Sequence, residues 1–384
     1  MFRRALISVL QEYATEFRAV LLVGPRQSGK TTLVQKTFPD KPYVSLENPD
    51  ERLLAERDPR AFLGRFPGGA ILDEVQRVPE LFSYLQEILD KKNQDGLFIL
   101  TGSNNILLQE NITQTLAGRL GILDLYPLSF RETTATGKDY TLNELIFKGS
   151  YPEVYHKNRK PELWYNAYIR TYVERDVRQI KNIENTSLFI KFLKICAGRT
   201  GQQINITDIS NACGIDLKTV QSWLSVLEQT YIIRLLQPYY NNFNKRILKT
   251  PKLYFVDTGL VCSLLGIRKI EELDLSHFRG ALVENYIIME CVKNNANQNA
   301  RRTFYYWRDN KGVEVDLIID SGTSFLPVEI KSAETFSNDF TKNLLKIKNY
   351  SGVKEAVIVY EGKMEFETSD GIKVLNRVSF LKTF

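Results

Sequence analysis

Residues 24–31 read Gly24-Pro25-Arg26-Gln27-Ser28-Gly29-Lys30-Thr31 and match the pattern G-x-x-x-x-G-K-[ST] at every specified position. The apolar run at 19–23 precedes this stretch, and residues 30–38 have helical periodicity, so the sequence predicts strand, loop and helix in that order. Glycines let such a loop curl until its backbone N–H groups point at phosphate oxygens, and the helix N-terminus adds a positive dipole end. The stretch therefore predicts a polyphosphate-binding loop, with an ordinary glycine-rich turn as the alternative.

Two residues of this loop have predicted roles in chemistry. Lys30 is expected to reach the β- and γ-phosphates, and the Thr31 hydroxyl to be one ligand of a Mg²⁺ ion that bridges them. The full set of predicted nucleotide-binding residues is Gly24, Pro25, Arg26, Gln27, Ser28, Gly29, Lys30, Thr31 and Thr32.

Length and composition limit the class of protein. The chain has 384 residues and 43% hydrophobic content, which predicts two or three packed domains. It has no apolar run long enough to cross a bilayer and no signal segment, so we expect a cytoplasmic protein without a membrane partner. Its four cysteines are far apart and it has two histidines, which argues against a zinc site or a disulfide framework and favours core cysteines.

The net charge of +6 is unevenly distributed. Residues 1–150 hold 18 Lys and Arg against 19 Asp and Glu, whereas residues 151–384 hold 33 against 26. This excess is compatible with a nucleic-acid partner in the C-terminal part, although a solvated surface explains it as well.

Strands and helices alternate through the first 150 residues. Strands are predicted at 42–47, 70–74 and 97–101, and helices at 2–17 and 80–92. Such alternation predicts an α/β domain over 1–150 whose parallel sheet binds ligands beyond the carboxyl ends of its strands.

Asp73 and Glu74 end a predicted strand at that ligand-binding edge. Asp73 is expected to hold the Mg²⁺, through water, and Glu74 to orient and deprotonate the attacking water. The alternative is a pair of solvated carboxylates.

Three more residues, later in the sequence, complete the predicted site. Ser103 or Asn104 would contact the γ-phosphate or its attacking water, although an N-cap role explains Ser103 nearly as well. Arg119 would stabilise transition-state charge in a neighbouring subunit of a homo-oligomer, or form a structural salt bridge.

These stretches resemble a family of bacterial and archaeal AAA+-type ATPases that carry a C-terminal domain long classed as of unknown function. The likeness is carried by the loop at 24–31, Ile-Leu-Asp-Glu-Val-Gln at 71–76, Leu-Thr-Gly-Ser at 100–103, Leu-Ala-Gly-Arg at 116–119, Tyr-Pro-Leu-Ser-Phe-Arg-Glu at 126–132, and the segments 149–154 and 168–177. The resemblance covers nearly the whole chain and implies ATP as the nucleotide, but leaves the biological role open.

Residues 151–260 are predicted to form a helical linker and a winged-helix-like region. Helices at 207–213 and 217–229 flank a tight turn, and a wing strand follows at 231–236. The second helix is expected to expose Lys218, Thr219, Gln221 and Ser222, for contact with DNA or with protein. The basic stretch Lys245, Arg246, Lys249 and Lys252 would grip phosphates or form a solvated loop.

Residues 261–384 are predicted to form a nuclease-like α/β domain. Asp316 and Glu329 are expected on neighbouring strands of a hairpin with its turn at 321–324, and Glu284 on a preceding helix. Asp316 and Glu329 would hold a Mg²⁺, and Lys331 would position the nucleophilic water or the scissile phosphate. This pattern resembles the D-x(n)-[DE]-x-K core of restriction-endonuclease-like nucleases. The alternative is an exposed ion-pair cluster, and the aromatic run at 304–307 is better explained as core than as a base-stacking surface.

The predicted function is Mg²⁺-dependent ATP hydrolysis coupled to DNA binding, with metal-dependent cleavage of nucleic acid by the C-terminal domain. The alternative is an ATP-dependent switch for protein interaction or regulation whose C-terminal domain does not cleave nucleic acid and serves as a docking surface.

Overall fold

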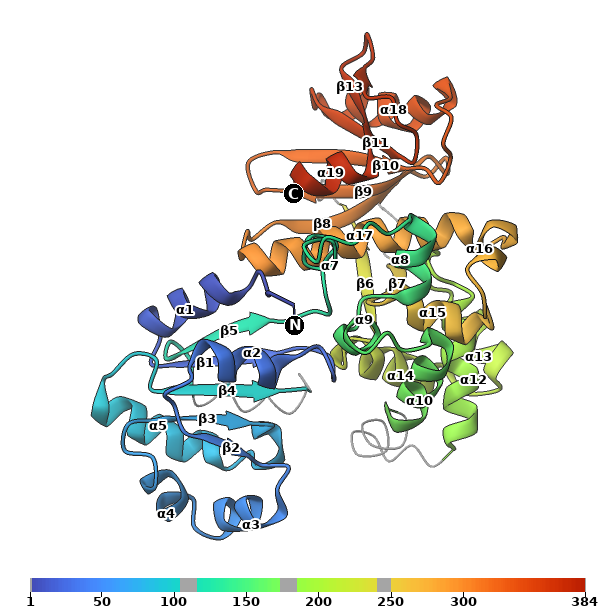
Figure 1. Ribbon diagram of the computed structural model, residues 1–384. Helices are drawn as coiled ribbons and strands as arrows, with labels where there is room; N and C mark the ends of the chain where they lie inside the picture. The colour runs from blue at the N-terminus through green and yellow to red at the C-terminus, as the bar shows by residue number, and fades with distance from the viewer. Residues whose placement is uncertain (1, 104–115, 173–184, 240–249, 384) are drawn as a thin grey trace. The chain divides into compact units, whose positions relative to one another are not determined.

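The computed structural model describes residues 2–103, 116–172, 185–239 and 250–383 (Figure 1). The chain forms two compact units. The first contains Met1–Leu128, Gln229–Tyr231 and Ala296–Asn299, and the second contains Ser129–Glu228, Ile232–Asn295 and Ala300–Phe384. Among the described residues, no helix is both long and apolar enough to span a membrane.

A five-stranded parallel sheet forms the centre of the first unit, with strand order β2-β3-β4-β1-β5. Its strands are β1 (Ala19–Val23), β2 (Tyr43–Ser45), β3 (Ala70–Asp73), β4 (Phe98–Gly102) and β5 (Leu120–Asp124). Its helices are α1 (Ile7–Glu16), α2 (Lys30–Thr37), α3 (Pro49–Arg57), α4 (Pro59–Gly64) and α5 (Leu81–Lys92), with a 3₁₀ turn η1 (Val75–Arg77). This mixed α/β unit with a parallel sheet confirms the predicted fold class.

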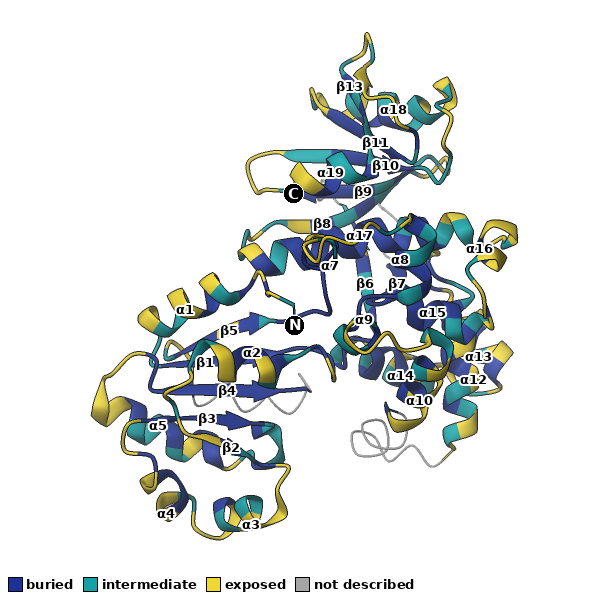
Figure 2. Cartoon of the chain, in the orientation of Figure 1, coloured by how far each residue is buried: buried dark blue, intermediate teal, exposed yellow. Residues whose placement is uncertain are grey.

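The central strands are continuous apolar runs because both faces of the sheet are covered. Every residue of β1, β3 and β4 is buried (Figure 2). The first predicted helix begins only at Ile7, and Leu6, Val9 and Leu10 pack with Val20 and other sheet residues in one apolar cluster. The sheet and its covering helices thus hold the loop after β1 in a fixed place.

The second unit begins with helices that the sequence places in the first domain. They are α7 (Phe130–Thr134) and α8 (Leu142–Lys148), and the helices that follow before the next sheet are α9 (Pro152–His156), α10 (Pro161–Tyr172), α12 (Thr186–Ala197), α13 (Ile206–Cys213) and α14 (Leu217–Gln229). The Phe130 N–H donates to the Glu290 carboxylate at 2.6 Å, and the Ser150 N–H to Asp257 at 2.6 Å. These buried bonds tie residues 130–150 to the second unit, whereas the sequence predicts a boundary at residue 150.

The helices α12, α13 and α14 are followed by an antiparallel pair, β6 (Ile233–Pro238) and β7 (Lys252–Phe255). Gln203, between α12 and α13, forms an antiparallel bridge with Lys252. The residues expected on the inner face of the helical pair, Ile209, Val220, Trp223 and Leu227, are buried, and Ile215 is half-buried.

An eight-stranded sheet completes the second unit, in the order β12-β13-β11-β10-β9-β8-β6-β7. Its further strands are β8 (Thr303–Arg308), β9 (Glu314–Asp320), β10 (Phe325–Ile330), β11 (Ala356–Tyr360), β12 (Phe366–Glu367) and β13 (Ile372–Asn376). Its further helices are α15 (Thr258–Leu265), α16 (Glu271–Leu275), α17 (Arg279–Gln298), α18 (Lys342–Ser351) and α19 (Arg377–Thr383), with a 3₁₀ turn η3 (Asn338–Thr341). Because β6 pairs with β8, the predicted wing strand belongs to the same sheet as the predicted nuclease-like domain.

Candidate functional site

The loop between β1 and α2 has the backbone geometry that requires glycine at two positions. Gly24 has a φ of +149°, and a Cβ atom there would lie 2.2 Å from the carbonyl oxygen of Leu125. Gly29 has a φ of +95° at the N-cap of α2. Lys30 is buried, and its ammonium donates hydrogen bonds of 2.9 Å to the carbonyl oxygens of Gly24 and Pro25. The predicted phosphate-binding lysine therefore lies against the backbone of its own loop.

The other loop residues differ in exposure. Arg26 pairs with Glu47 at 3.8 Å, Gln27 is exposed with a φ of 62°, and Thr32 is exposed on α2. Ser28 is fully buried, and its hydroxyl has no hydrogen-bond partner within the part of the chain that the structure describes. A buried hydroxyl in a curled loop is available to an entering ligand.

Thr31 and Asp73 come together as the sequence predicts. The Thr31 hydroxyl lies 3.1 Å from both carboxylate oxygens of Asp73, which ends β3. The hydroxyl groups of Thr101 and Tyr43 also donate to this carboxylate, the latter at 2.8 Å. Burial, and after it the negative charge of Asp73, raises the pKa of Tyr43 to about 12. A hydroxyl and a carboxylate of this kind are hard oxygen ligands, so the pair fits Mg²⁺.

Glu74 follows directly and points to a different set of partners. It has a left-handed φ of 59°, and its N–H donates to the Thr101 hydroxyl at 3.3 Å. Its carboxylate accepts a hydrogen bond of 3.0 Å from the Ser103 hydroxyl and another from the Gln76 side-chain amide, which also donates to Ser103 at 3.1 Å. The structure thus joins Glu74 to Ser103, and adds Gln76 and Thr101, to which the sequence gives no role.

Arg4 is a further residue that sequence reasoning missed. It is buried, and its guanidinium donates to the carbonyl oxygens of Ser28 at 2.7 Å and Tyr126 at 2.6 Å. Arg4 therefore links the phosphate-binding loop to the backbone at Tyr126. In the sequence, Arg4 falls within the predicted helix at 2–17, where nothing distinguishes it from a solvated charge.

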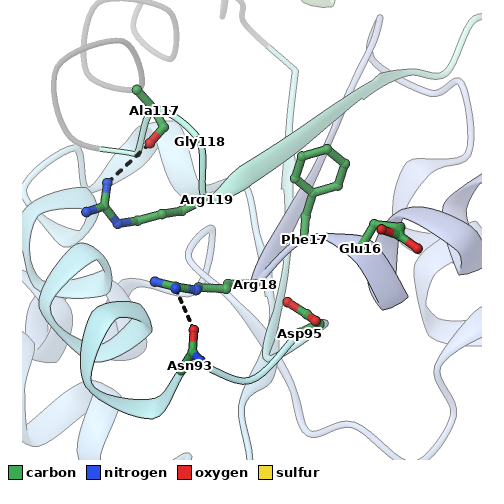
Figure 3. A pocket seen from close by; sticks show the side chains of 8 residues that line it. All are labelled: Glu16, Phe17, Arg18, Asn93, Asp95, Ala117, Gly118 and Arg119. Carbon is green, nitrogen blue, oxygen red and sulfur yellow. Dashed lines mark hydrogen bonds between the residues drawn. The ribbon is translucent and has the colours of Figure 1, made fainter.

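Arg119 forms the salt bridge that the sequence offers as its alternative role. Its guanidinium contacts both carboxylate oxygens of Asp90, at 2.5 and 3.0 Å, and Arg18 binds the same carboxylate at 3.1 Å. Figure 3 shows Arg18 and Arg119 on one side of an open pocket of about 500 Å³, with Asn93 bonded to Arg18. The pocket is lined by Glu16, Phe17, Arg18, Asn93, Asp95, Ala117, Gly118 and Arg119.

This pocket lies at the edge of the sheet opposite to the loop at 24–31. Arg119 directly precedes β5, and β5 runs parallel to β1 with Leu120 beside Ala19 and Asp124 beside Val23. The loop follows Val23, so roughly 13 Å of strand separates Arg119 from it. The arginine does not share an edge with its own chain's loop.

The acidic residues of the C-terminal part lie on the predicted hairpin. Strands β9 and β10 are antiparallel, with Leu317 opposite Val328 and the turn at 321–324. Near the end of this pairing, the Ile330 N–H donates to the Asp316 carboxylate at 2.8 Å. The Lys331 ammonium contacts one oxygen of Glu329 at 2.7 Å. The other oxygen of Glu329 is buried and has no hydrogen-bond partner among the described residues.

Glu284 reaches this group from α17 and brings a cation with it. One of its oxygens accepts from the Tyr254 hydroxyl at 2.5 Å and contacts the Lys252 ammonium at 3.1 Å. Lys252 also contacts Glu314 at 2.5 Å and is only 3% exposed. The expectation that Lys252 grips phosphates in a basic surface stretch is wrong, because β7 buries its ammonium between two carboxylates.

Burial and like charge act on the carboxylates of this cluster together. Burial, and after it the charge of Asp316, raises the pKa of Glu329 to about 8 and that of Glu284 to about 7, while Lys331 and Lys252 oppose these shifts. The four groups predicted from the sequence are therefore close enough to interact. Within the described ranges, no three His, Cys, Asp or Glu side chains form a ready metal cage. In this cluster Lys252 holds Glu284 and Glu314, which leaves Asp316 and Glu329 as the pair that could bind a metal ion.

The predicted nucleic-acid surfaces have less support. On α14, Lys218 and Gln221 are exposed, whereas Thr219 and Ser222 are half-buried and the Thr219 hydroxyl binds Asp216. On β8, Phe304 and Tyr306 are buried, in agreement with the core interpretation. Asn104, Lys245, Arg246, Lys249 and the segment 173–177 lie outside the described residues.

Comparison with known sequences assigns the first part of the chain. Residues 16–134 match an AAA domain, so this part is a P-loop ATPase-like domain, and nucleotide binding follows from its loop. Residues 139–271 and 279–380 match two domains of unknown function, DUF8612 and DUF4143.

Relatives extend over most of the chain. An uncharacterized protein of Mycobacterium tuberculosis is 29% identical over 95% of this chain and 81% of its own length. An uncharacterized protein of Methanocaldococcus jannaschii is 25% identical over 78% of this chain and 71% of its own length. Among solved structures, a Walker-type ATPase of Pyrococcus abyssi covers 67% of this chain and 94% of its own at 15% identity, with a TM-score of 0.45. RuvB of Thermotoga maritima covers 60% and 85% at 17% identity, with a TM-score of 0.29.

Proposed function

We propose that this protein binds ATP with Mg²⁺ and hydrolyses it at the carboxyl edge of the first unit's sheet. The observation that carries the proposal is the contact between the Thr31 hydroxyl and the Asp73 carboxylate, beside the loop that holds Lys30. A loop lysine, a helix hydroxyl and a strand-end carboxylate are the groups that P-loop enzymes use for phosphates and metal. The donor set therefore fits the nucleotide and its ion.

Each residue has a part that its surroundings support. Lys30 would exchange its two carbonyl partners for β- and γ-phosphate oxygens, and Thr31 and Asp73 would hold the ion, which neutralises developing charge. Glu74 would take the proton of the attacking water, with Ser103 and Gln76 holding its carboxylate in place. Arg119 lies at the far edge and is paired with Asp90, so a role in catalysis would require it to leave Asp90 and act on a neighbouring copy in a homo-oligomer.

The test is phosphate release by the full chain with ATP and Mg²⁺. Wild-type protein should hydrolyse ATP, and activity should disappear with EDTA or after Thr31→Ala. Wild-type protein that binds ATP without hydrolysing it would contradict the catalytic half of the proposal.

We also propose that ATP hydrolysis is coupled to the binding of DNA. Two observations support it: the order α12, bridge, α13, α14, β6, β7 is the one expected of a winged helix, and the C-terminal part carries the chain's positive excess. The ATPase rate should therefore rise with duplex DNA at low salt and lose that stimulation at higher salt. An unchanged rate at both salt concentrations favours the rival, a switch for protein partners.

A second candidate function is metal-dependent cleavage of phosphodiesters by the C-terminal domain. The observation that favours it is the placement of Asp316, Glu329 and Lys331 at one end of a hairpin, with a buried oxygen of Glu329 left without a partner. That oxygen and the Asp316 carboxylate fit one Mg²⁺ or Mn²⁺, which would activate water and stabilise the departing oxygen. The assay is cleavage of duplex, branched and single-stranded DNA with either ion, with and without ATP. If wild-type protein cuts none of them, the domain is a docking surface.

A further inference from the structure

Lys252 is the buried cation of the carboxylate cluster formed by Glu284, Glu314, Asp316 and Glu329. Its side chain is 3% exposed, and its ammonium lies 2.5 Å from Glu314 and 3.1 Å from Glu284. The ring of Tyr306 lies beneath it, with 5.6 Å from the ammonium to the ring centroid.

The four carboxylates fall into two pairs according to the lysine that they contact: Glu284 and Glu314 contact Lys252, and in the other pair Glu329 contacts Lys331. In the first pair, Glu284 also accepts a hydrogen bond from Tyr254, and Glu314 also pairs with Arg308. In the other pair, Asp316 accepts one backbone N–H, and Glu329 keeps a buried oxygen without a partner.

The two lysines of the cluster differ in whether their ammonium groups can move away from the carboxylates that they contact. The Lys331 side chain is 31% exposed, so its ammonium can turn to solvent or to a phosphate when an ion arrives. Lys252 has no such route, because a buried ammonium that loses its carboxylates remains uncompensated. A second divalent ion beside Glu284 would also face this fixed positive charge at close range.

We propose that Lys252 is the resident second cation of the carboxylate cluster, so that the cluster takes a single divalent ion, held by Asp316 and Glu329. The proposal rests on the cleavage site proposed above and specifies its metal content. Lys252 acts here as a positioning residue, since it fixes Glu284 and Glu314 and touches neither the ion nor the substrate.

The experiment counts Mn²⁺ ions bound to nucleotide-free full-length protein, by paramagnetic resonance of free Mn²⁺. An Asp73→Asn background removes the carboxylate of the predicted metal site beside the phosphate-binding loop. The parent should bind one ion, and adding Asp316→Asn should abolish that binding. Adding Lys252→Met should allow a second ion, or tighten the first by about tenfold or more, because a repelling charge is lost.

A matched control uses another buried lysine of the same unit. Lys293 contacts Glu290 at 2.9 Å, and both side chains are almost fully buried. Lys293→Met should therefore cost stability without changing the number of ions. Should Lys252→Met not fold, the double variant Lys252→Met/Glu314→Gln replaces the ion pair by a neutral pair and should give the same gain.

The possible results distinguish failure of the Lys252 role from failure of the cleavage site on which it rests. Two ions on the parent protein, or one ion at unchanged affinity after Lys252→Met, refutes the role of Lys252 and leaves the cleavage site standing. If the parent binds no Mn²⁺, or binds it equally after Asp316→Asn, the cleavage site itself is refuted, and the inference with it.

Discussion

Replacement of Glu74 by glutamine should separate nucleotide binding from hydrolysis. The amide has nearly the shape of the carboxylate, so its oxygen can still accept the 3.0 Å hydrogen bond from Ser103. An amide takes no proton at neutral pH, so the variant loses the base while the local structure is kept. The hydrogen bonds described for Glu74 go to Ser103, Gln76 and Thr101, none of which belongs to the phosphate-binding loop.

The size of the effect follows from this arrangement. A positioned general base contributes about 10²- to 10⁴-fold to a rate, which corresponds to about 3–5 kcal/mol of activation free energy. We therefore expect Glu74→Gln to lower the rate of phosphate release at saturating ATP and Mg²⁺ by at least about 100-fold. Since no loop contact is lost, nucleotide affinity, measured with a fluorescent analogue, should change by less than about threefold.

The matched control is Glu80→Gln, which makes the same chemical change on an exposed residue just before α5. It should hydrolyse ATP at the wild-type rate. A Glu74→Gln rate within about tenfold of wild type would refute the assignment of Glu74 as the base, and a large loss of nucleotide affinity would mean that Glu74 shapes the binding site instead.

Other residues give shorter tests. Lys30→Ala should abolish nucleotide binding or turnover, and mixing it with Arg119→Ala should restore part of the activity in co-assembled oligomers; no recovery despite co-assembly argues against action in trans. Asp316→Asn should lower Mn²⁺ affinity and DNA cleavage together, whereas Lys331→Ala should lose cleavage and keep the ion. Because burial raises the pKa of Glu329 to about 8 in the folded chain, folding takes up a proton between the unfolded pKa of about 4.5 and that value, so metal-free stability should fall as pH rises through this window. Thermal unfolding should show a shallower fall for Glu329→Gln, and an equal fall would contradict the assigned shift.

The nucleotide site was predictable to the extent that it is local in sequence. The loop, the strand before it and the helix after it are consecutive, and Asp73 ends an apolar run, so a motif and a hydrophobic pattern suffice to place them. Thr101 and Tyr43 were missed because their hydroxyl groups reach Asp73 from neighbouring strands. Strand order and register decide such contacts, and neither is written in a single stretch of sequence.

In the C-terminal cluster, too, the contacts that are local in sequence were predictable and those that depend on strand pairing were not. Period-two alternation and a short turn predict that Asp316 and Glu329 lie on neighbouring strands of a hairpin. In the structure β9 and β10 are antiparallel, with Leu317 opposite Val328. The sequence places Lys252 in a basic stretch because Lys245, Arg246 and Lys249 lie within the preceding seven residues. Its burial depends on the pairing of β7 with β6 and on the packing of α17, which bring carboxylates to it from more than thirty residues away.

The surroundings of Lys30 and Lys252 explain why we propose different roles for these two buried lysines. Lys30 donates to two neutral carbonyl oxygens, and a charged phosphate oxygen is a stronger acceptor for an ammonium than a carbonyl is. Exchange of these partners for a polyphosphate is therefore favourable. Lys252 already has two carboxylates, so a phosphate oxygen offers it no stronger partner, and leaving them would strand buried charge of both signs. A lysine held by carbonyl oxygens can release them to a ligand, whereas a lysine held by carboxylates fixes the site around it.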